Sequence, residues 1–75
     1  MNCDAELDAT GLLCPLPVLK ARKRLKILEK GQVLKMMADD PAAIVDVPHF
    51  CAEQGHILLQ QSVEGTIQIY FLQKS

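Results

Sequence analysis

The sequence predicts a two-layer α/β sandwich with the order β-α-β-α-β-β, in which a mixed four-stranded sheet carries two helices on one face. Segments that alternate apolar and polar residues mark the strands, and two segments with helical signals separate the first three of them. Strand–helix–strand units have right-handed crossovers, which place both helices on the same side of the sheet. A chain of 75 residues forms one domain at most, here residues 1–75, with a thin core.

The first half of the chain contains a strand, a helix and a second strand. Residues 3–8, Cys-Asp-Ala-Glu-Leu-Asp, alternate like a strand with one buried face, and residues 9–11 follow as a turn. A helix is expected over residues 15–30, with Gly31 as its C-terminal stop. Residues 32–38 are mostly apolar on both alternating sets, as in an interior strand. The expected core positions of the helix are Val18, Ala21, Leu25 and Leu28.

Two prolines define the second helix. Asp40 can cap a helix, and Pro41 fits the first turn because its missing N–H would have no partner there. Pro48 should break a continuous helix. We therefore expect a short helical turn and then a restart, capped by Asp46, that runs to Gly55.

Two more strands complete the chain. They are expected over residues 57–63 and 66–72, joined by a two-residue hairpin turn at Glu64-Gly65. The alternating apolar set of the last strand is Ile67, Ile69 and Phe71.

Composition and cysteine count narrow the functional class. Hydrophobic residues make up 49% of the chain and the net charge is −1, as in an ordinary soluble domain. The N-terminus has no secretory pattern and no apolar stretch reaches the ~20 residues of a membrane span, so we expect a cytoplasmic protein with no membrane partner. Cys3, Cys14 and Cys51 cannot all pair within one chain and lack zinc-site spacing. We expect three free thiols, no metal and no organic cofactor.

The stretch Leu13-Cys14-Pro15-Leu16-Pro17 carries the chemistry. A residue before proline avoids helical geometry, so Cys14 is expected as the N-cap, with Pro15 as the first helical residue. The helix dipole would then lower the pKa of the thiol, and the N–H of Leu16 could reach the sulfur. Pro17 stands where a Cys-x-x-Cys redox motif has its second thiol, so a local disulfide is excluded.

The chain resembles the TusA/SirA family of small sulfur carriers. The resemblance lies in the pattern Leu7-Asp8-x-x-Gly11-x-x-Cys14-Pro15-x-Pro17, then in Ala38-Asp39-Asp40-Pro41-Ala42 and Asp46-x-Pro48-x-Phe50-Cys51. It implies the same mixed sheet with two helices on one face. It also implies that Cys14 accepts sulfur from the persulfide of a cysteine desulfurase and passes it to the next protein of a relay. Relays of this family lead to 2-thiouridine in tRNA, to molybdenum cofactor or to sulfur oxidation.

We therefore interpret the protein as a sulfurtransferase that acts with a desulfurase and an acceptor protein, with tRNA 2-thiouridine as the expected product. Asp8, Gly11, Pro15 and Pro17 are the supporting motif. Asp8 and Gly11 suit a turn, although Asp8 could instead orient the Cys14 loop. Asp40 and Asp46 are explained as helix caps, although Asp40 could also lie beside Cys14 and face a partner.

The basic segment between Lys20 and Lys30 holds six of the eight Lys and Arg residues. It suits docking of an acidic partner, with Lys20 and Arg22 as the expected contacts. Direct nucleic-acid binding is not expected, because Phe50, Tyr70 and Phe71 are too few for base stacking. The alternative function is nevertheless a binding or regulatory module that uses this segment for a protein or nucleic acid.

The remaining reactive side chains have simpler explanations. Cys51 is expected in the core, and Cys3 is expected to fill the first strand. The two histidines, His49 and His56, are expected at the surface or at helix ends. A redox switch that joins Cys14 to Cys51 or Cys3 is a third possible function.

Overall fold

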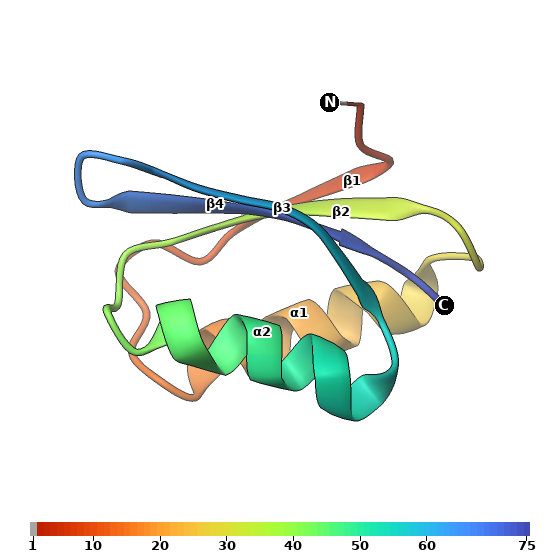
Figure 1. Cartoon of the computed structure of the whole chain (residues 1–75), viewed down its shortest axis with the longest axis horizontal. Helices are drawn as coiled ribbons and strands as arrows, with labels where there is room; N and C mark the ends of the chain where they lie inside the picture. Colours follow the sequence, from red (N-terminus) through yellow and green to blue (C-terminus); the bar gives the residue numbers. More distant parts are fainter. Residues whose placement is uncertain (1) are drawn as a thin grey trace.

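The computed structural model describes residues 2–75 and confirms the predicted order and layers. Both helices cover one face of a four-stranded sheet, and within residues 2–75 the other face carries no helix (Figure 1). The elements are β1 (Ala5–Asp8), α1 (Leu16–Ile27), β2 (Val33–Ala38), α2 (Ala43–Gln54), β3 (Ile57–Glu64) and β4 (Ile67–Gln73).

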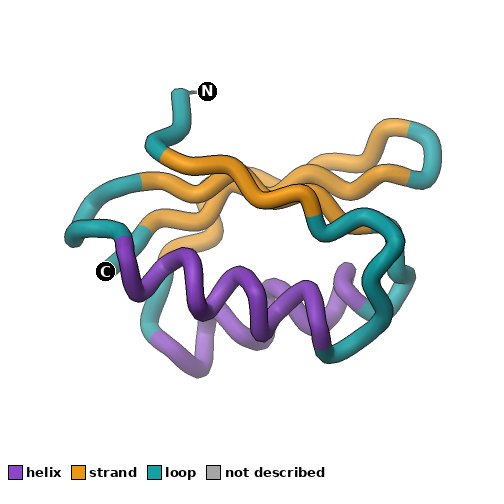
Figure 2. Tube along the Cα trace, turned by 180° about the vertical axis from the view of Figure 1, so that it is seen from behind, coloured by secondary structure: helices purple, strands orange, loops and turns teal. Residues whose placement is uncertain are grey.

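The sheet has the order β1-β2-β4-β3 and is mixed, as predicted. β1 is parallel to β2, whereas β4 is antiparallel to both β2 and β3. Leu7 pairs with Met36, and Met36 pairs with Tyr70, so these three side chains share the face that the helices cover. The loops that enter α1 and α2 lie side by side at one edge of the sandwich (Figure 2).

The core lies between the helices and this face of the sheet. From α1 it contains Ala21 and Leu25, with Val18 and Leu28 packed against it, as expected. In β4 the buried residues are Gln68, Tyr70 and Leu72 together with Phe71, so of the alternating apolar set only Phe71 is buried, while Ile67 and Ile69 are half-buried. The register of β4 with β2 decides this, because it opposes Tyr70 to Met36 and Ile69 to Met37.

The first strand begins two residues later than expected, so Cys3 lies outside it. Asp4 still pairs with Val33 just before β1. Its N–H donates to the Val33 carbonyl at 2.8 Å, and its carboxylate, not its carbonyl, accepts from the Val33 N–H at 2.8 Å. One of the two hydrogen bonds at this position is thus made by a side chain.

Helix α1 ends at Ile27, three residues before the predicted end. Leu28 leaves the helix in an extended conformation and packs against the core. The Leu25 carbonyl accepts from the Leu28 N–H at 3.2 Å and from Lys74 Nζ at 2.6 Å, which satisfies the helix end. Gly31 therefore belongs to the following turn, with φ of +91°, rather than to the helix terminus.

Helix α2 is continuous from Ala43 to Gln54, and the predicted break at Pro48 is wrong. Its buried side chains are Ala43, Val47, Phe50 and Cys51, which lie on both sides of the proline. Packing of one continuous apolar face outweighs the hydrogen bond that Pro48 removes. Gly55 ends the helix in the left-handed region, as predicted.

The last hairpin turn is shifted by one residue from its predicted position. β3 continues through Glu64, which pairs with Ile67, so the two turn residues are Gly65 and Thr66. Gly65 has φ of +63°, a backbone conformation that a residue with a Cβ adopts only with strain.

Candidate functional site

Cys14 lies in the loop between β1 and α1, one residue before the helix cap. Pro15 is the N-cap and Leu16 the first helical residue, so the expectation that Cys14 caps the helix is wrong. The Cys14–Pro15 peptide bond is cis. The Leu16 N–H donates to the Leu13 carbonyl at 2.9 Å and not to the sulfur. Pro17 is buried and is the second helical residue. It has no N–H, and an N–H at that position would have no partner within the helix.

The loop that carries Cys14 is held by the loop that enters α2. The Gly11 N–H donates to Asp39 Oδ1 at 2.9 Å, and the Cys14 N–H donates to Asp40 Oδ2 at 2.7 Å. The Ala42 N–H occupies the other carboxylate oxygen of Asp40 at 3.1 Å. These two amides hold the pKa of Asp40 below its usual value, the Cys14 amide most strongly. Asp40 therefore lies beside Cys14, with both of its carboxylate oxygens already engaged.

Asp40 is tied to the core through a buried polar side chain that sequence reasoning missed. Gln68 Nε2 donates to the Asp40 carbonyl at 2.8 Å, and the Tyr70 hydroxyl donates to Gln68 Oε1 at 2.6 Å. Gln68 is only 3% exposed. The one signal in the sequence is a glutamine placed among apolar residues of a strand. Three hydrogen bonds thus connect the centre of β4 to the backbone of Cys14.

The Cys14 sulfur is exposed, and it donates a hydrogen bond to Asp46 Oδ2 at 2.7 Å. This bond raises the pKa of the thiol above its ordinary value of 9.0, and desolvation and the charges of Asp46 and Asp40 raise the pKa further. The expected lowering of this pKa is therefore wrong. The hydrogen bond to Asp46, desolvation and the charges of two carboxylates of the second helix region all disfavour the thiolate.

Asp46 was expected as a helix cap, and this is also wrong. It lies in the first turn of α2, whose N-cap is Ala42 with no side-chain hydrogen bond. The Ala43 N–H donates instead to the Asp40 carbonyl at 2.9 Å. The carboxylate of Asp46 is thus free to contact Cys14 from the other helix, which spacing along the chain does not reveal.

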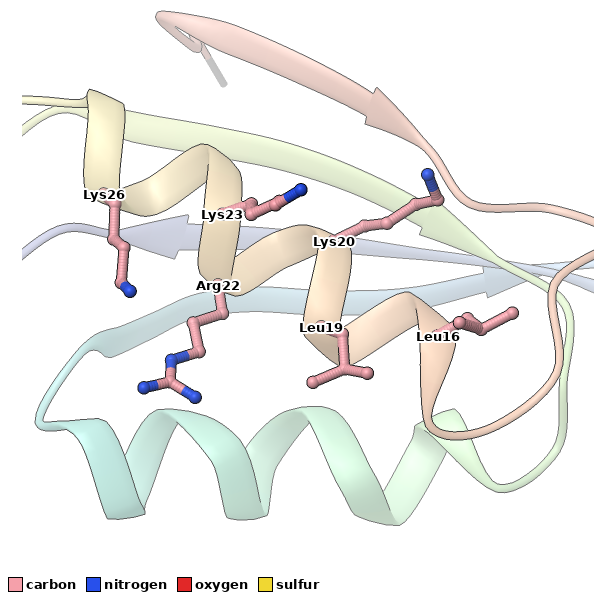
Figure 3. Close-up of a pocket in the computed structure, with 6 residues that line it drawn as sticks. All are labelled: Leu16, Leu19, Lys20, Arg22, Lys23 and Lys26. Atoms are coloured by element: carbon pink, nitrogen blue, oxygen red, sulfur yellow. The ribbon is translucent and has the colours of Figure 1, made fainter.

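Two surface depressions border α1, and one of them contains the sulfur. A groove of about 180 Å³ runs between the helices and contains Cys14; it is lined by Cys14, Pro15, Val18, Asp46, His49, Phe50 and Glu53. A second depression, of about 460 Å³, lies along α1 and is lined by Leu16, Leu19, Lys20, Arg22, Lys23 and Lys26. Figure 3 shows that Arg22 and Leu19 point toward α2, whereas Lys20 and Lys23 point away from α2. The surface beside the sulfur is thus acidic on α2 and basic on α1.

Two residues of the supporting motif shape the turn after β1. Asp8 Oδ1 accepts from the Thr10 hydroxyl at 2.6 Å and from the Thr10 N–H at 3.0 Å. Both bonds lower the pKa of Asp8, the hydroxyl most strongly. Gly11 has φ of +80°, the left-handed conformation that its turn requires. Asp8 therefore forms the turn and does not touch Cys14 directly.

The other thiols and the histidines lie in ordinary environments. Cys51 is buried in the core, as predicted, and burial raises its pKa to about 11. Cys3 is half-buried. His49 is exposed with Nε2 3.4 Å from Glu53, and His56 Nδ1 accepts from the Ser75 N–H at 3.3 Å. Within residues 2–75 there is no group of three potential metal ligands, and no helix is long and apolar enough to cross a membrane.

A family model and a known relative agree on one family, and a solved structure shares the fold. The family model described as Sulfurtransferase TusA matches residues 5–74. The sulfur carrier protein TusA of Pseudomonas entomophila (strain L48) is 46% identical over 71 residues, which cover 95% of this chain and 89% of that protein. The crystal structure of a SirA-like protein from Desulfitobacterium hafniense has the same fold, with a TM-score of 0.80 at 21% identity over 92% of this chain and 95% of that one.

Proposed function

The chain belongs to the TusA family of sulfur carriers, and on that premise we propose that Cys14 accepts sulfur from a cysteine desulfurase and relays it to an acceptor protein. The observation that supports this is the exposure of Cys14 on a loop fixed by hydrogen bonds at Gly11 and at Cys14 itself. Cys51 is buried, and Cys3 lies outside the motif. Cys14 is thus the one exposed thiol of the three.

The transfer consists of two thiol exchanges. The Cys14 thiolate attacks the outer sulfur of the donor's cysteine persulfide, forming a new S–S bond while the old S–S bond breaks and the donor leaves as a thiolate. An acceptor thiolate then attacks the outer sulfur of the Cys14 persulfide, and Cys14 leaves as a thiolate. Sulfur moves without net oxidation or reduction. An open site suits this chemistry, because each partner supplies its own enclosure.

We place the donor or acceptor on the basic depression of α1. Lys20 and Arg22 line this depression together with the apolar Leu16 and Leu19, which are 45% and 48% exposed. Cations around exposed apolar side chains suit an acidic protein surface with an apolar centre. Asp40, also expected as a partner contact, remains a prediction, although its role in the free protein is to hold the loop.

Mass spectrometry of the intact protein tests the proposal. The wild type is incubated with a cysteine desulfurase, its pyridoxal phosphate and L-cysteine, beside Cys14→Ser and the matched control Cys3→Ser. We expect a gain of one sulfur atom, reversed by dithiothreitol, in the wild type and in Cys3→Ser but not in Cys14→Ser. A gain that persists in Cys14→Ser would contradict the assignment of the carrier residue.

The expected end product is 2-thiouridine in tRNA. A bacterial strain that lacks its own carrier is complemented with the wild type or with Cys14→Ser, and tRNA nucleosides are measured by mass spectrometry. Restored 2-thiouridine with the wild type alone would support this pathway. Restored sulfur loading without 2-thiouridine would contradict it and direct attention to another acceptor.

The alternative, a binding module that uses the basic segment, is tested by reversing charge at Lys20, Arg22 and Lys23. Arg24 is left unchanged because its guanidinium donates to the Glu6 carbonyl at 2.9 Å and so supports the fold. If Cys14→Ser keeps the biological activity and the charge-reversed variant loses it, the carrier function is wrong and the binding module is supported.

A further inference from the structure

The contact between Asp46 and Cys14 joins the two helices at the reacting atom. Asp46 comes from α2, and Cys14 comes from the loop before α1, 32 residues away along the chain. Within residues 2–75, the Cys14 sulfur is the hydrogen-bond donor to the Asp46 side chain, and no Lys, Arg or His lies within 4.0 Å of its carboxylate. The carboxylate therefore has a thiol for a partner but no cation.

The chemistry of the two groups sets where the proton lies while Asp46 is ionised. A carboxylate accepts and does not donate, so the contact is made only while the sulfur holds its proton. The carboxylates of Asp46 and Asp40 face the sulfur, and both disfavour the loss of its proton. The groove adds Glu53 and the titratable His49, which lie 3.4 Å apart and pair with each other, whereas the α1 side contributes the uncharged Pro15 and Val18. Loss of the thiol proton would place the thiolate beside the carboxylates of Asp46 and Asp40.

We propose that Asp46 keeps Cys14 as a protonated thiol in the free carrier, and that a cationic side chain of the sulfur-donating protein releases it by pairing with the Asp46 carboxylate. This inference rests on the proposed function and adds a control step to it. On pairing, the sulfur gives its proton to water and attacks the outer sulfur of the donor persulfide. The donor's cysteine leaves as a thiolate and takes up a proton from water, so protons balance over the exchange.

This arrangement gives the exposed sulfur selectivity. Oxidants and alkylating agents react with the thiolate and not with the thiol, so a protonated Cys14 is protected in the free protein. A cation in the acidic groove changes the local charge only where a partner is bound. The α1 depression is basic and so cannot attract that cation, which directs the donor's positive group to the α2 side.

The first test measures the reactivity of Cys14 without any partner. The rate of alkylation by iodoacetamide is followed at Cys14 by site-resolved mass spectrometry as a function of pH. Asp46→Asn is compared with the wild type and with Glu29→Gln. The second variant makes the same charge change two residues after the C-terminal end of α1, whereas Cys14 precedes the N-terminal end of that helix. We expect Asp46→Asn to react roughly 5-fold faster near neutral pH, with its pH profile moved to lower pH, and Glu29→Gln to match the wild type. Unchanged alkylation in Asp46→Asn would overturn the proposal.

The second test adds the donor. In Asp46→Asn the cation of the donor has no carboxylate to pair with, so kcat/KM for sulfur loading by the desulfurase should fall although the thiol reacts faster with iodoacetamide. A merely structural role for Asp46 would not move these two rates in opposite directions. Loading that rises in parallel with alkylation would overturn release by the donor. A third outcome is that the wild type is not loaded with sulfur although Asp46→Asn is alkylated faster than the wild type. That outcome would refute the proposed function and release by the donor, but it would still support stabilisation of the protonated thiol by Asp46.

Discussion

Replacing Tyr70 with phenylalanine measures how strongly the core supports the loop that carries Cys14. The Tyr70 hydroxyl is fully buried and donates to Gln68, which in turn donates to the Asp40 carbonyl. The substitution removes a hydrogen bond worth about 0.5–1.5 kcal/mol and leaves a buried acceptor on Gln68 unsatisfied, which raises the total cost to about 1–3 kcal/mol. For a domain of this size each kcal/mol lowers Tm by about 4–8 °C. We therefore expect a fall in Tm of at least about 4 °C.

Urea unfolding under reducing conditions, followed by far-UV circular dichroism, gives the free energies for Tyr70→Phe, Gln68→Leu and the double variant. Because each single change orphans the group that the other change removes, the double variant should cost less than their sum, with a coupling of about 0.5–3 kcal/mol. Gln68→Leu should also speed hydrogen exchange at the Cys14 amide, since it removes one of the two hydrogen bonds that the Asp40 carbonyl accepts. A loss below about 0.5 kcal/mol in Tyr70→Phe, or additive single changes, would refute this reasoning.

Two further predictions concern stability. Burial raises the pKa of Cys51 from 9.0 to about 11 and that of Tyr70 from 10.0 to about 12, so the folded state keeps protons that the unfolded chain has released. The free energy of unfolding should therefore fall as pH rises above 9, and Cys51→Ala should show a smaller fall between about pH 8 and pH 10.5 in urea titrations. Pro48→Ala restores a backbone N–H inside α2 and should raise the free energy of unfolding by about 1 kcal/mol or more, seen as a higher Tm. An unchanged or lower Tm would show that the helix is already adapted to the proline.

The fold could be predicted because its signals are local. Alternation in the strands, helical spacing from Val18 to Leu28 and the glycine at position 55 each act within a few residues. The sequence-based predictions are wrong where residues far apart in the chain determine the local structure. The end of α1 depends on Lys74, the buried face of β4 depends on its register with β2, and the continuity of α2 depends on packing around Pro48.

The same division applies to the site. The exposure of Cys14 at the corner between strand and helix follows from the Cys-Pro-x-Pro pattern, but its place before the helix cap and the state of its thiol do not. Helix-end chemistry alone predicts a lowered pKa, whereas the structure brings in Asp46 from 32 residues away and reverses the direction. Local rules predict the corner, and the hydrogen bonds that hold the loop and the charges around the sulfur come from the tertiary structure.

The mutual support of the two helix-entry loops limits how this carrier can change. Asp39 and Asp40 each bind one amide of the loop that holds Cys14, so an inserted or deleted residue in either loop would misalign at least one of these bonds. The outer side chains of α1, such as Leu19 and Arg22, contribute nothing to this arrangement. Substitutions that change the choice of partner can therefore leave the Cys14 loop intact only when they lie on the helix surfaces. Those surfaces are the place to redesign the carrier for a new relay.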